Sequence, residues 1–268
     1  MGFDYKKVLL IGATSGIGAA LADTLVQNGV FVIGVGRRKE RLESFVQKHG
    51  SGKTDYRVFD VNDTHEAQSF VDEVFTAHPD ISFVFLNSGI QRGLDFTNPS
   101  TVSLDTFEHE LKTNYTAPVH LTKALLPYLT RQSNPTALAY TTTQLALITL
   151  NSRPNYGASK AALHHFILAL RAQLSKSAPN LKVIEVFPPA VQTELHDSKN
   201  QPDLKNGDQI GMPLKDFTEE LWEGLKAGRE DVPVGSARPI WEAIEPGRRE
   251  ESGKFNDAMD EALTDFLA

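Results

Sequence analysis

Short apolar runs alternate with longer stretches of mixed polarity along most of the chain. The runs are KVLLIG, VFVIGVG, TDYRVFDV, ISFVFLN, TALAYTT and LKVIEVF. Because their apolar residues are continuous and do not alternate with polar ones, the runs predict strands buried on both faces of a parallel sheet. Helical patterns lie between them at residues 17–27, 38–48, 64–77, about 106–129 and 156–174.

This alternation of strand and helix predicts an α/β fold, a single-domain Rossmann-type doubly wound parallel sheet with helices on both faces. Ligands of such sheets bind at the carboxyl ends of the strands. No linker or repeat divides residues 1–268. An irregular segment at about 190–226 predicts either a partly helical substrate lid or a surface excursion without function. Residues 248–268 predict an acidic helical tail.

Composition narrows the classes of function. The 268 residues carry a net charge of −7, which argues against binding nucleic acid, and contain no cysteine, so a disulfide or thiolate metal site is impossible. The eight histidines form no HExxH pattern, and we expect no metal. Neither a signal peptide nor about 18 consecutive apolar residues is present, so we expect a cytoplasmic protein without a membrane partner.

A glycine-rich turn, IGATSGIGAAL, follows the first predicted strand. Its glycines, Gly12, Gly16 and Gly18, suit a tight turn, a close backbone approach to a pyrophosphate and close packing of the next helix. The helix N-terminus would face the anion. We therefore predict a dinucleotide site that also includes Thr14, Ser15 and Ile17.

The end of the second predicted strand indicates which dinucleotide binds. An acidic residue there would hold a ribose 2′-hydroxyl, but the sequence has Gly36, followed by Arg37 and Arg38. Two guanidiniums without a carboxylate favour a 2′-phosphate, to which Ser15 adds a hydroxyl, so the prediction is NADP(H). The alternative is that both arginines only solvate the start of a helix.

Tyr156 and Lys160 are spaced i and i+4 on a predicted helix and share one face. A tyrosine hydroxyl titrates near 10, and a nearby ammonium favours the phenolate. The pair therefore suits proton transfer to an alkoxide, although such pairs occur on many helices.

These motifs, together with LNSG, KTNYTAPVHLTKALLP and FPPAVQTEL, resemble the short-chain dehydrogenase/reductase family over about residues 7–195. The resemblance implies an oxidoreductase that transfers hydride between a nicotinamide and a carbonyl compound. It assigns Tyr156 as acid/base, Lys160 as its partner and ribose ligand, Asn114 as part of a proton relay and Thr143 as the polarising hydroxyl. The cofactor residues that it adds are Asp60, Val61, Asn87, Gly89, Pro188, Val191 and Thr193.

Several positions depart from the family pattern. Ile11 replaces threonine, Ser88 replaces alanine and Pro189 replaces glycine, while Thr143 stands where serine is usual. Threonine keeps the hydroxyl but adds a methyl that restricts χ1. The sequence does not decide whether the hydroxyl or the methyl of Thr143 faces Tyr156. The prediction is an NADPH-dependent carbonyl reductase, and the alternative is a non-catalytic NADP(H)-binding regulator.

The expected partner is a small carbonyl or alcohol substrate. Predicted pocket walls are residues 90–94, 145–148, Pro189 and residues 212–217. Arg153 is expected in solvent, and the alternative is that it pairs with a carboxylate. The resemblance also implies a homodimer or homotetramer formed through the helices at 106–129 and 156–174.

Overall fold

A parallel sheet forms the centre of the protein. Within residues 2–263 and 266, which the computed structural model describes, seven strands run in the order β3-β2-β1-β4-β5-β6-β7. Each neighbouring pair is parallel, as the apolar runs predict. The bounds are β1 Lys7–Ile11, β2 Phe31–Gly36, β3 Thr54–Val58, β4 Phe83–Leu86, β5 Thr136–Thr141, β6 Leu181–Phe187 and β7 Asp231–Pro233.

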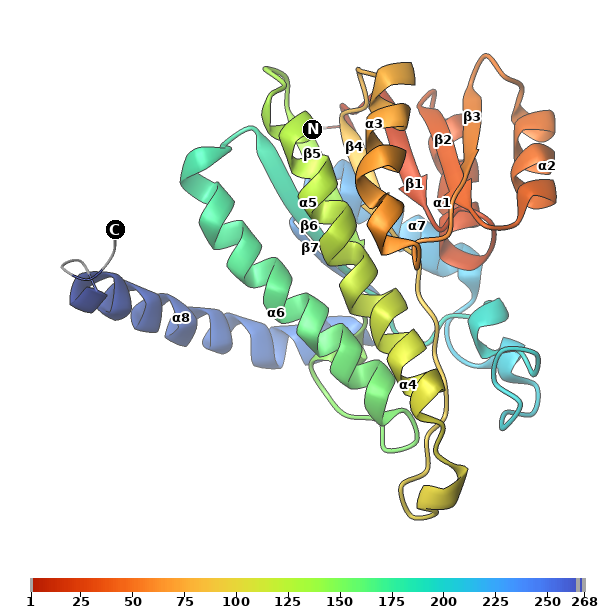
Figure 1. The fold of residues 1–268 in the computed structure, drawn as a ribbon, viewed down its shortest axis with the longest axis vertical. Coiled ribbons are helices and arrows are strands. Elements are labelled where there is room, and N and C mark those ends of the chain that lie inside the picture. Colours follow the sequence, from red (N-terminus) through yellow and green to blue (C-terminus); the bar gives the residue numbers. More distant parts are fainter. Residues whose placement is uncertain (1, 264–265, 267–268) are drawn as a thin grey trace.

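Helices cover both faces of the sheet (Figure 1). One face carries α3 (Ala67–Ala77), α5 (Ala117–Thr130) and α6 (Pro154–Ser177), and the other carries α1 (Gly16–Gln27), α2 (Lys39–His49) and α7 (Leu214–Lys226). Successive residues of β1 alternate between the two cores: Leu9 packs on one face and Leu10 on the other. Because both faces are covered, both sets are apolar, which explains the continuous runs.

The chain reverses its direction across the sheet between β1 and β4. From β1 it winds outward to β2 and β3, then returns past β1 to β4. Ile11 at the end of β1 is level with Val35 of β2 and Leu86 of β4. A crevice for ligands opens at such a switch point, and Gly12 follows Ile11 directly into it.

Two predicted helices are divided in the structure. A short 3-10 helix, Thr64–Glu66, precedes α3, and the helix expected at 106–129 consists of α4 (Leu104–Leu111), a π-helical turn (Lys112–Thr116) and α5. A π turn adds one residue to a helical turn, a change too small for a hydrophobic pattern to reveal. β7 was also missed, because its three residues are too short for an apolar run.

The segment expected to be a lid has two parts. Residues 190–213 are irregular, with 3-10 turns at Glu194–His196 and Gly207–Gln209, whereas α7 packs on the sheet. The prediction that Phe217 lines the pocket is wrong, because its side chain is fully buried between α7 and the sheet. Met212 packs against the same core.

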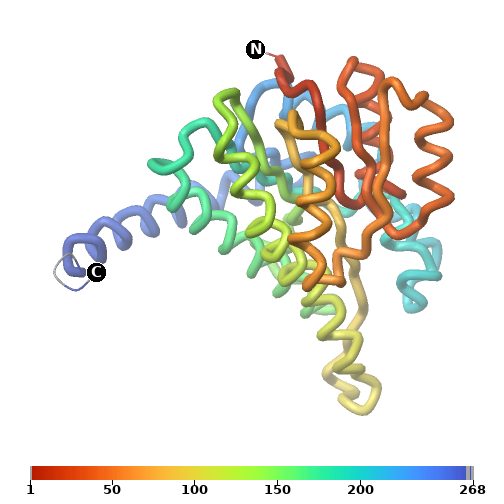
Figure 2. Tube along the Cα trace, turned by 45° about the horizontal axis from the view of Figure 1, so that its top comes forward, coloured from red at the N-terminus to blue at the C-terminus, as the bar shows by residue number. Residues whose placement is uncertain are grey.

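The last helix, α8 (Ala237–Leu263), begins before the predicted tail. Its first part packs near β7, and its C-terminal half extends away from the rest of the protein in both views (Figures 1 and 2). Positions 264, 265, 267 and 268 of the predicted tail lie outside the described residues. None of the described helices is both long and apolar enough to cross a membrane.

Candidate active site

A cleft of about 750 Å³ opens at the carboxyl ends of the strands. Most residues predicted to bind cofactor or to act in catalysis line it. They are Gly12, Thr14, Ser15, Gly16, Ile17, Arg37, Arg38, Asp60, Val61, Asn87, Gly89, Thr143, Tyr156, Lys160, Pro188, Val191 and Thr193. Gly18 and Asn114 lie behind this lining.

The glycine turn leaves no room for side chains. Gly12 has a φ of 94°, and a Cβ there would lie 2.8 Å from the backbone nitrogen of Ser88. Gly16 has a φ of 53° and faces Thr193, while a Cβ on Gly18 would overlap the carbonyl oxygen of Gly12. The backbone is therefore exposed to the cleft at the start of α1, as a phosphate site requires.

Arg38 lies across this turn. Its Nη2 donates to Ser15 Oγ at 2.6 Å and to Thr14 Oγ1 at 2.8 Å, and its Nη1 pairs with Glu194 at 2.8 Å. Arg41 joins the same carboxylate at 2.6 Å. The sequence alone does not single out Arg41 or Glu194, because 153 positions separate them.

Arg37 is oriented toward β3. Its Nη1 lies 3.3 Å from Oδ2 of Asp60, whose other oxygen accepts from the backbone nitrogen of Asn62 at 3.0 Å. At Gly36 a Cβ would lie 2.6 Å from the methyl carbon of Thr14, so a larger residue is disfavoured.

Asn87 connects three strand ends. Its Nδ2 donates to Gly12 O at 3.2 Å, and its Oδ1 accepts from Thr141 Oγ1 at 2.8 Å. Ile11 brings no hydroxyl to this point, and Thr141 of β5 supplies one to Asn87. The side chain therefore holds the glycine turn against β4 and β5.

Thr143 directs its hydroxyl toward Tyr156, close enough to act on the pKa of the phenol. The same Oγ1 donates to Pro188 O at 3.3 Å and accepts from Leu145 N at 3.2 Å. The tertiary structure thus selects the rotamer that the sequence left open. Burial and then the charge of Glu110 raise the pKa of Tyr156, whereas the hydroxyl of Thr143 acts to lower it. The net lowering expected from Lys160 is not present, because desolvation dominates.

Lys160 is buried, and its Nζ donates to Thr141 O at 2.7 Å. Burial lowers the pKa of Lys160 to about 8, while Glu185 and Glu110 act in the opposite direction. No motif in the sequence points to Glu110. Its carboxylate accepts from Arg92 N at 2.7 Å and from Asn155 Nδ2 at 2.7 Å, just behind Tyr156.

Asn114 lies within the π turn and is fully buried. Its Oδ1 accepts from Ile90 N at 2.9 Å, and its Nδ2 donates to Ile90 O at 2.9 Å and to Ser159 Oγ at 3.1 Å. Gly89 is placed so that an added Cβ would lie 3.4 Å from both Asn114 Oδ1 and Lys160 Nζ. The π turn therefore brings Asn114 beside the lysine.

The turn after β6 closes the opposite wall. Pro188 O accepts from Gln144 N at 3.0 Å, which joins the ends of β5 and β6. Val191 is buried and bridges to Met212, and Thr193 Oγ1 accepts from Leu195 N at 3.4 Å. Pro189 lines the cleft.

Arg153 is only 4% exposed, so the expectation that it is solvated is wrong. Its Nε donates to Gln201 Oε1 at 2.8 Å and its Nη2 to Asp203 Oδ2 at 2.6 Å. Gln201 in turn donates to Gln91 Oε1 at 2.8 Å. Burial and the charge of Arg153 lower the pKa of His196, which keeps this imidazole neutral at pH 7. The group fastens the irregular segment to the rim of the cleft.

Comparisons with known proteins agree with this architecture. The short chain dehydrogenase family model matches residues 6–204. The uncharacterized oxidoreductase DltE of Bacillus subtilis (strain 168) is 32% identical over 227 residues, which are 85% of this chain and 87% of the relative.

Two solved structures share the fold. A short chain dehydrogenase from Burkholderia cenocepacia J2315 in complex with NADP has a TM-score of 0.75 and 22% identity, covering 95% of this chain and 98% of that one. A short chain dehydrogenase/reductase from Burkholderia phymatum in complex with NAD has a TM-score of 0.78 and 19% identity, covering 91% and 92%. The match to the family model and the identity to DltE show that the chain belongs to the short-chain dehydrogenase/reductase family of oxidoreductases.

Proposed function

We propose that the protein is an NADPH-dependent reductase of ketones or aldehydes that also catalyses the reverse oxidation of alcohols. The observation that carries the proposal is the convergence of a hydroxyl pair, Thr143 and Tyr156, with the buried ammonium of Lys160 in one cleft. The glycine turn at the other end of that cleft supports binding of a dinucleotide.

The residues present fit NADP(H). Gly12, Gly16 and Gly18 leave the space beside the helix N-terminus free for a pyrophosphate. Arg38 and Ser15 already share a hydrogen bond, and a 2′-phosphate would take donors from both. When bound, this cofactor supplies or accepts the hydride.

Proton transfer falls to the side chains of the chain itself. Tyr156 donates its phenolic proton to the substrate oxygen, and Thr143 donates a hydrogen bond that stabilises the developing charge. Lys160 favours the phenolate that results, and the cleft holds the substrate carbonyl beside these groups. Asn114 positions the backbone around Lys160 through its paired bonds to Ile90.

The remaining assignments are proposals of the same kind. The cofactor site is completed by Asp60, Val61, Asn87, Gly89, Pro188, Val191 and Thr193. The substrate is a small uncharged or hydrophobic carbonyl compound. The protein is a cytoplasmic homodimer or homotetramer.

The test is oxidation of NADPH and of NADH by the purified protein against a panel of aldehydes, ketones and diketones, with Tyr156→Phe as the control. Turnover that prefers NADPH and is lost in Tyr156→Phe supports the proposal. Tight NADPH binding without turnover across the panel would contradict the reductase function and favour a non-catalytic NADP(H)-binding regulator.

Arg38→Leu tests the cofactor preference separately. The loss of charge-assisted hydrogen bonds to the 2′-phosphate should raise the Kd for NADPH about tenfold or more and leave the Kd for NADH nearly unchanged. An equal effect on both cofactors would refute the role of Arg38.

A further inference from the structure

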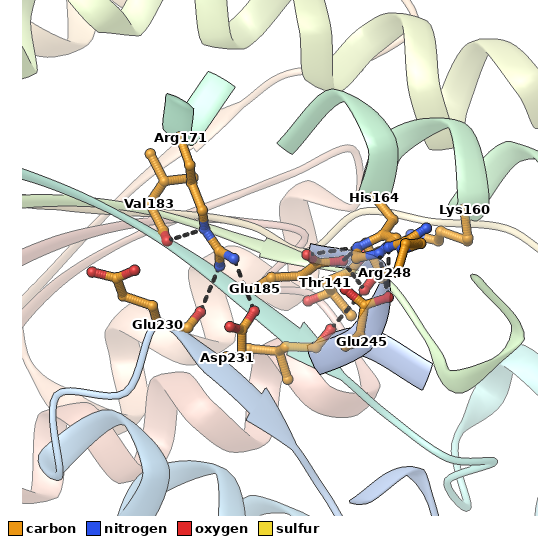
Figure 3. Close-up of polar contacts among 12 residues, drawn as sticks. Thr141, Lys160, His164, Arg171, Val183, Glu185, Glu230, Asp231, Glu245 and Arg248 are labelled. Atoms are coloured by element: carbon orange, nitrogen blue, oxygen red, sulfur yellow. Dashed lines mark hydrogen bonds and ion pairs between the residues drawn. The ribbon is translucent and has the colours of Figure 1, made fainter. Parts of the chain in front are cut away.

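A buried group of charged side chains lies directly behind the proposed catalytic lysine. His164 of α6, Glu185 of β6 and Glu245 of α8 are each 0% exposed. Figure 3 shows them gathered beside Lys160 and Thr141. The proposed reaction uses none of the three, although burying two carboxylates carries a large cost unless charge and hydrogen bonds compensate it.

His164 stands between the two carboxylates. Its Nδ1 is 2.8 Å and 2.9 Å from the two carboxylate oxygens of Glu185, and its Nε2 is 3.2 Å from Oε1 of Glu245. His164 therefore links β6 to α8, because one ring nitrogen is hydrogen-bonded to Glu185 and the other lies at ion-pair distance from Glu245.

Glu185 connects this buried group to the end of β5, where Thr141, Thr142 and Thr143 lie. Its Oε1 accepts from Thr142 Oγ1 at 2.7 Å. Thr142 lies between Thr141, whose carbonyl accepts from Lys160, and Thr143, whose hydroxyl faces Tyr156. Along α6, His164 follows Lys160 by one turn and shares its face. In the part of the chain that the structure describes, no carboxylate lies within ion-pair distance of Lys160 Nζ.

The other end of the group is fixed by α8 and β7. Glu245 lies 2.6 Å from Nη2 of Arg248 and 3.1 Å from Nε of Arg249, and Arg249 also binds Asp231 at the start of β7. Arg171 of α6 pairs with Asp231 at 2.9 Å. Arg248 and Arg249 therefore flank the outer carboxylate, Glu245, while Arg171 and Arg249 hold Asp231. On the side of the cleft, Glu110 of α4 is the other buried carboxylate whose charge acts on Lys160.

We propose that Glu185 is a positioning residue for catalysis, held by His164 and Glu245: its charge stabilises the ammonium form of Lys160, and its bond to Thr142 orients the strand end that carries Thr143. The proposal rests on the proposed function insofar as Lys160 is taken as the catalytic lysine. It assigns to α8 a role at the active site, because Glu245 is the residue of that helix that faces His164.

Electrostatics support the direction of the effect. Burial lowers the pKa of Lys160 to about 8, and Glu185 is the first of the two carboxylates that oppose this lowering. Removing one nearby opposite charge should lower the pKa of Lys160 further, by about one unit. Lys160 would then lose its proton within the neutral pH range.

The test is Glu185→Gln, which keeps an acceptor for Thr142 and removes the charge. The direct measurement is the titration of Lys160 by NMR of carbon-13-labelled lysine, with the signal assigned by its absence in Lys160→Arg. The midpoint should fall by about one pH unit relative to wild type. An unchanged midpoint would overturn the proposal. This titration needs no substrate. If the wild-type protein shows no turnover, the proposed function is refuted, but the titration of Lys160 can still be measured and still tests the role of Glu185.

Activity gives a second readout. In Glu185→Gln, the pH at which kcat for reduction begins to fall should shift down with the lysine midpoint, while KM measured well below that pH changes little. A uniform loss of kcat at every pH would indicate a merely structural role and would contradict the proposal.

Two further variants complete the design. Glu245→Gln removes the outer charge and should shift the Lys160 midpoint in the same direction by less. If Glu185→Gln does not fold, this variant decides the question, and an unshifted midpoint overturns the proposal. The matched control is Asp55→Asn, which breaks a second histidine–carboxylate pair, 2.9 Å from His78 Nε2, at the far edge of the sheet. It should leave the midpoint of Lys160 unchanged.

Discussion

Thr143→Val is the substitution that most directly tests the proposed chemistry. Valine has nearly the shape of threonine but lacks the hydroxyl. Thr143 is only 5% exposed, so no water replaces the missing group easily. The variant therefore removes one hydrogen-bonding group from the side of Tyr156 and leaves the outline of the cleft intact.

The expected loss follows from the contacts of this hydroxyl. Its bond to Pro188 O is long, 3.3 Å, and Pro188 O keeps a second donor, Gln144 N, at 3.0 Å. The Thr143 proton can therefore turn to a substrate oxygen at little cost. Removing one such donor typically lowers kcat by about 10²–10³, or about 2.7–4 kcal/mol. Leu145 N–H loses its acceptor as well, which should lower the free energy of unfolding by about 1 kcal/mol.

The assay is kcat and KM with NADPH and the best carbonyl substrate, measured well below the thermal midpoint of each variant. Thr143→Ser is the control: it keeps the hydroxyl and should retain or raise kcat. Valine and wild-type enzymes with equal kcat would refute the role assigned to this hydroxyl. A fall in kcat in the serine variant as large as in the valine variant would show that the methyl, and not the hydroxyl, matters.

Three other predictions concern pH, stability and the rim of the cleft. Because the pKa of Lys160 is about 8, the ammonium is lost as pH rises through that value, and kcat for reduction should fall over the same range in a pH profile. Burial acts to raise the pKa of Asp231, but Arg249 and Arg171 hold this pKa below its ordinary value in the folded protein. The ion pairs of Asp231 therefore stabilise the fold fully above the pKa of Asp231 in the unfolded chain, and this stabilisation is lost as pH falls through the lower pKa of the folded protein. Asp231→Asn should accordingly lower the free energy of unfolding, measured in urea, by about 3 kcal/mol at pH 7 and by progressively less below about pH 4. An equal loss at neutral and acidic pH would contradict the ion-pair account. Arg153→Met should raise KM for the carbonyl substrate about tenfold and leave the Kd for NADPH unchanged, because it releases the irregular segment from the rim; an unchanged KM would show that this contact is dispensable.

The sequence by itself determined the class of fold and the approximate place of the site. Continuous apolar runs that alternate with amphipathic helical stretches suit a parallel sheet covered on both faces, and the glycine turn after the first strand then lies at its carboxyl edge. Local spacing was also sufficient to place Tyr156 and Lys160 on one face of a helix, because the helical repeat fixes that relation.

Only the tertiary structure decided the contacts between distant segments. The rotamer of Thr143 depends on Pro188 and Tyr156, and the burial of Arg153 depends on a segment about 50 residues further along the chain. Phe217 was misplaced for the same reason: an apolar residue in an irregular segment fits a lid or a core, and packing decides between them. The balance of charges at Lys160 likewise comes from Glu185 and Glu110, which approach it through the sheet and α4. Coulomb energies depend on distances and burial in space, which spacing along a sequence does not contain.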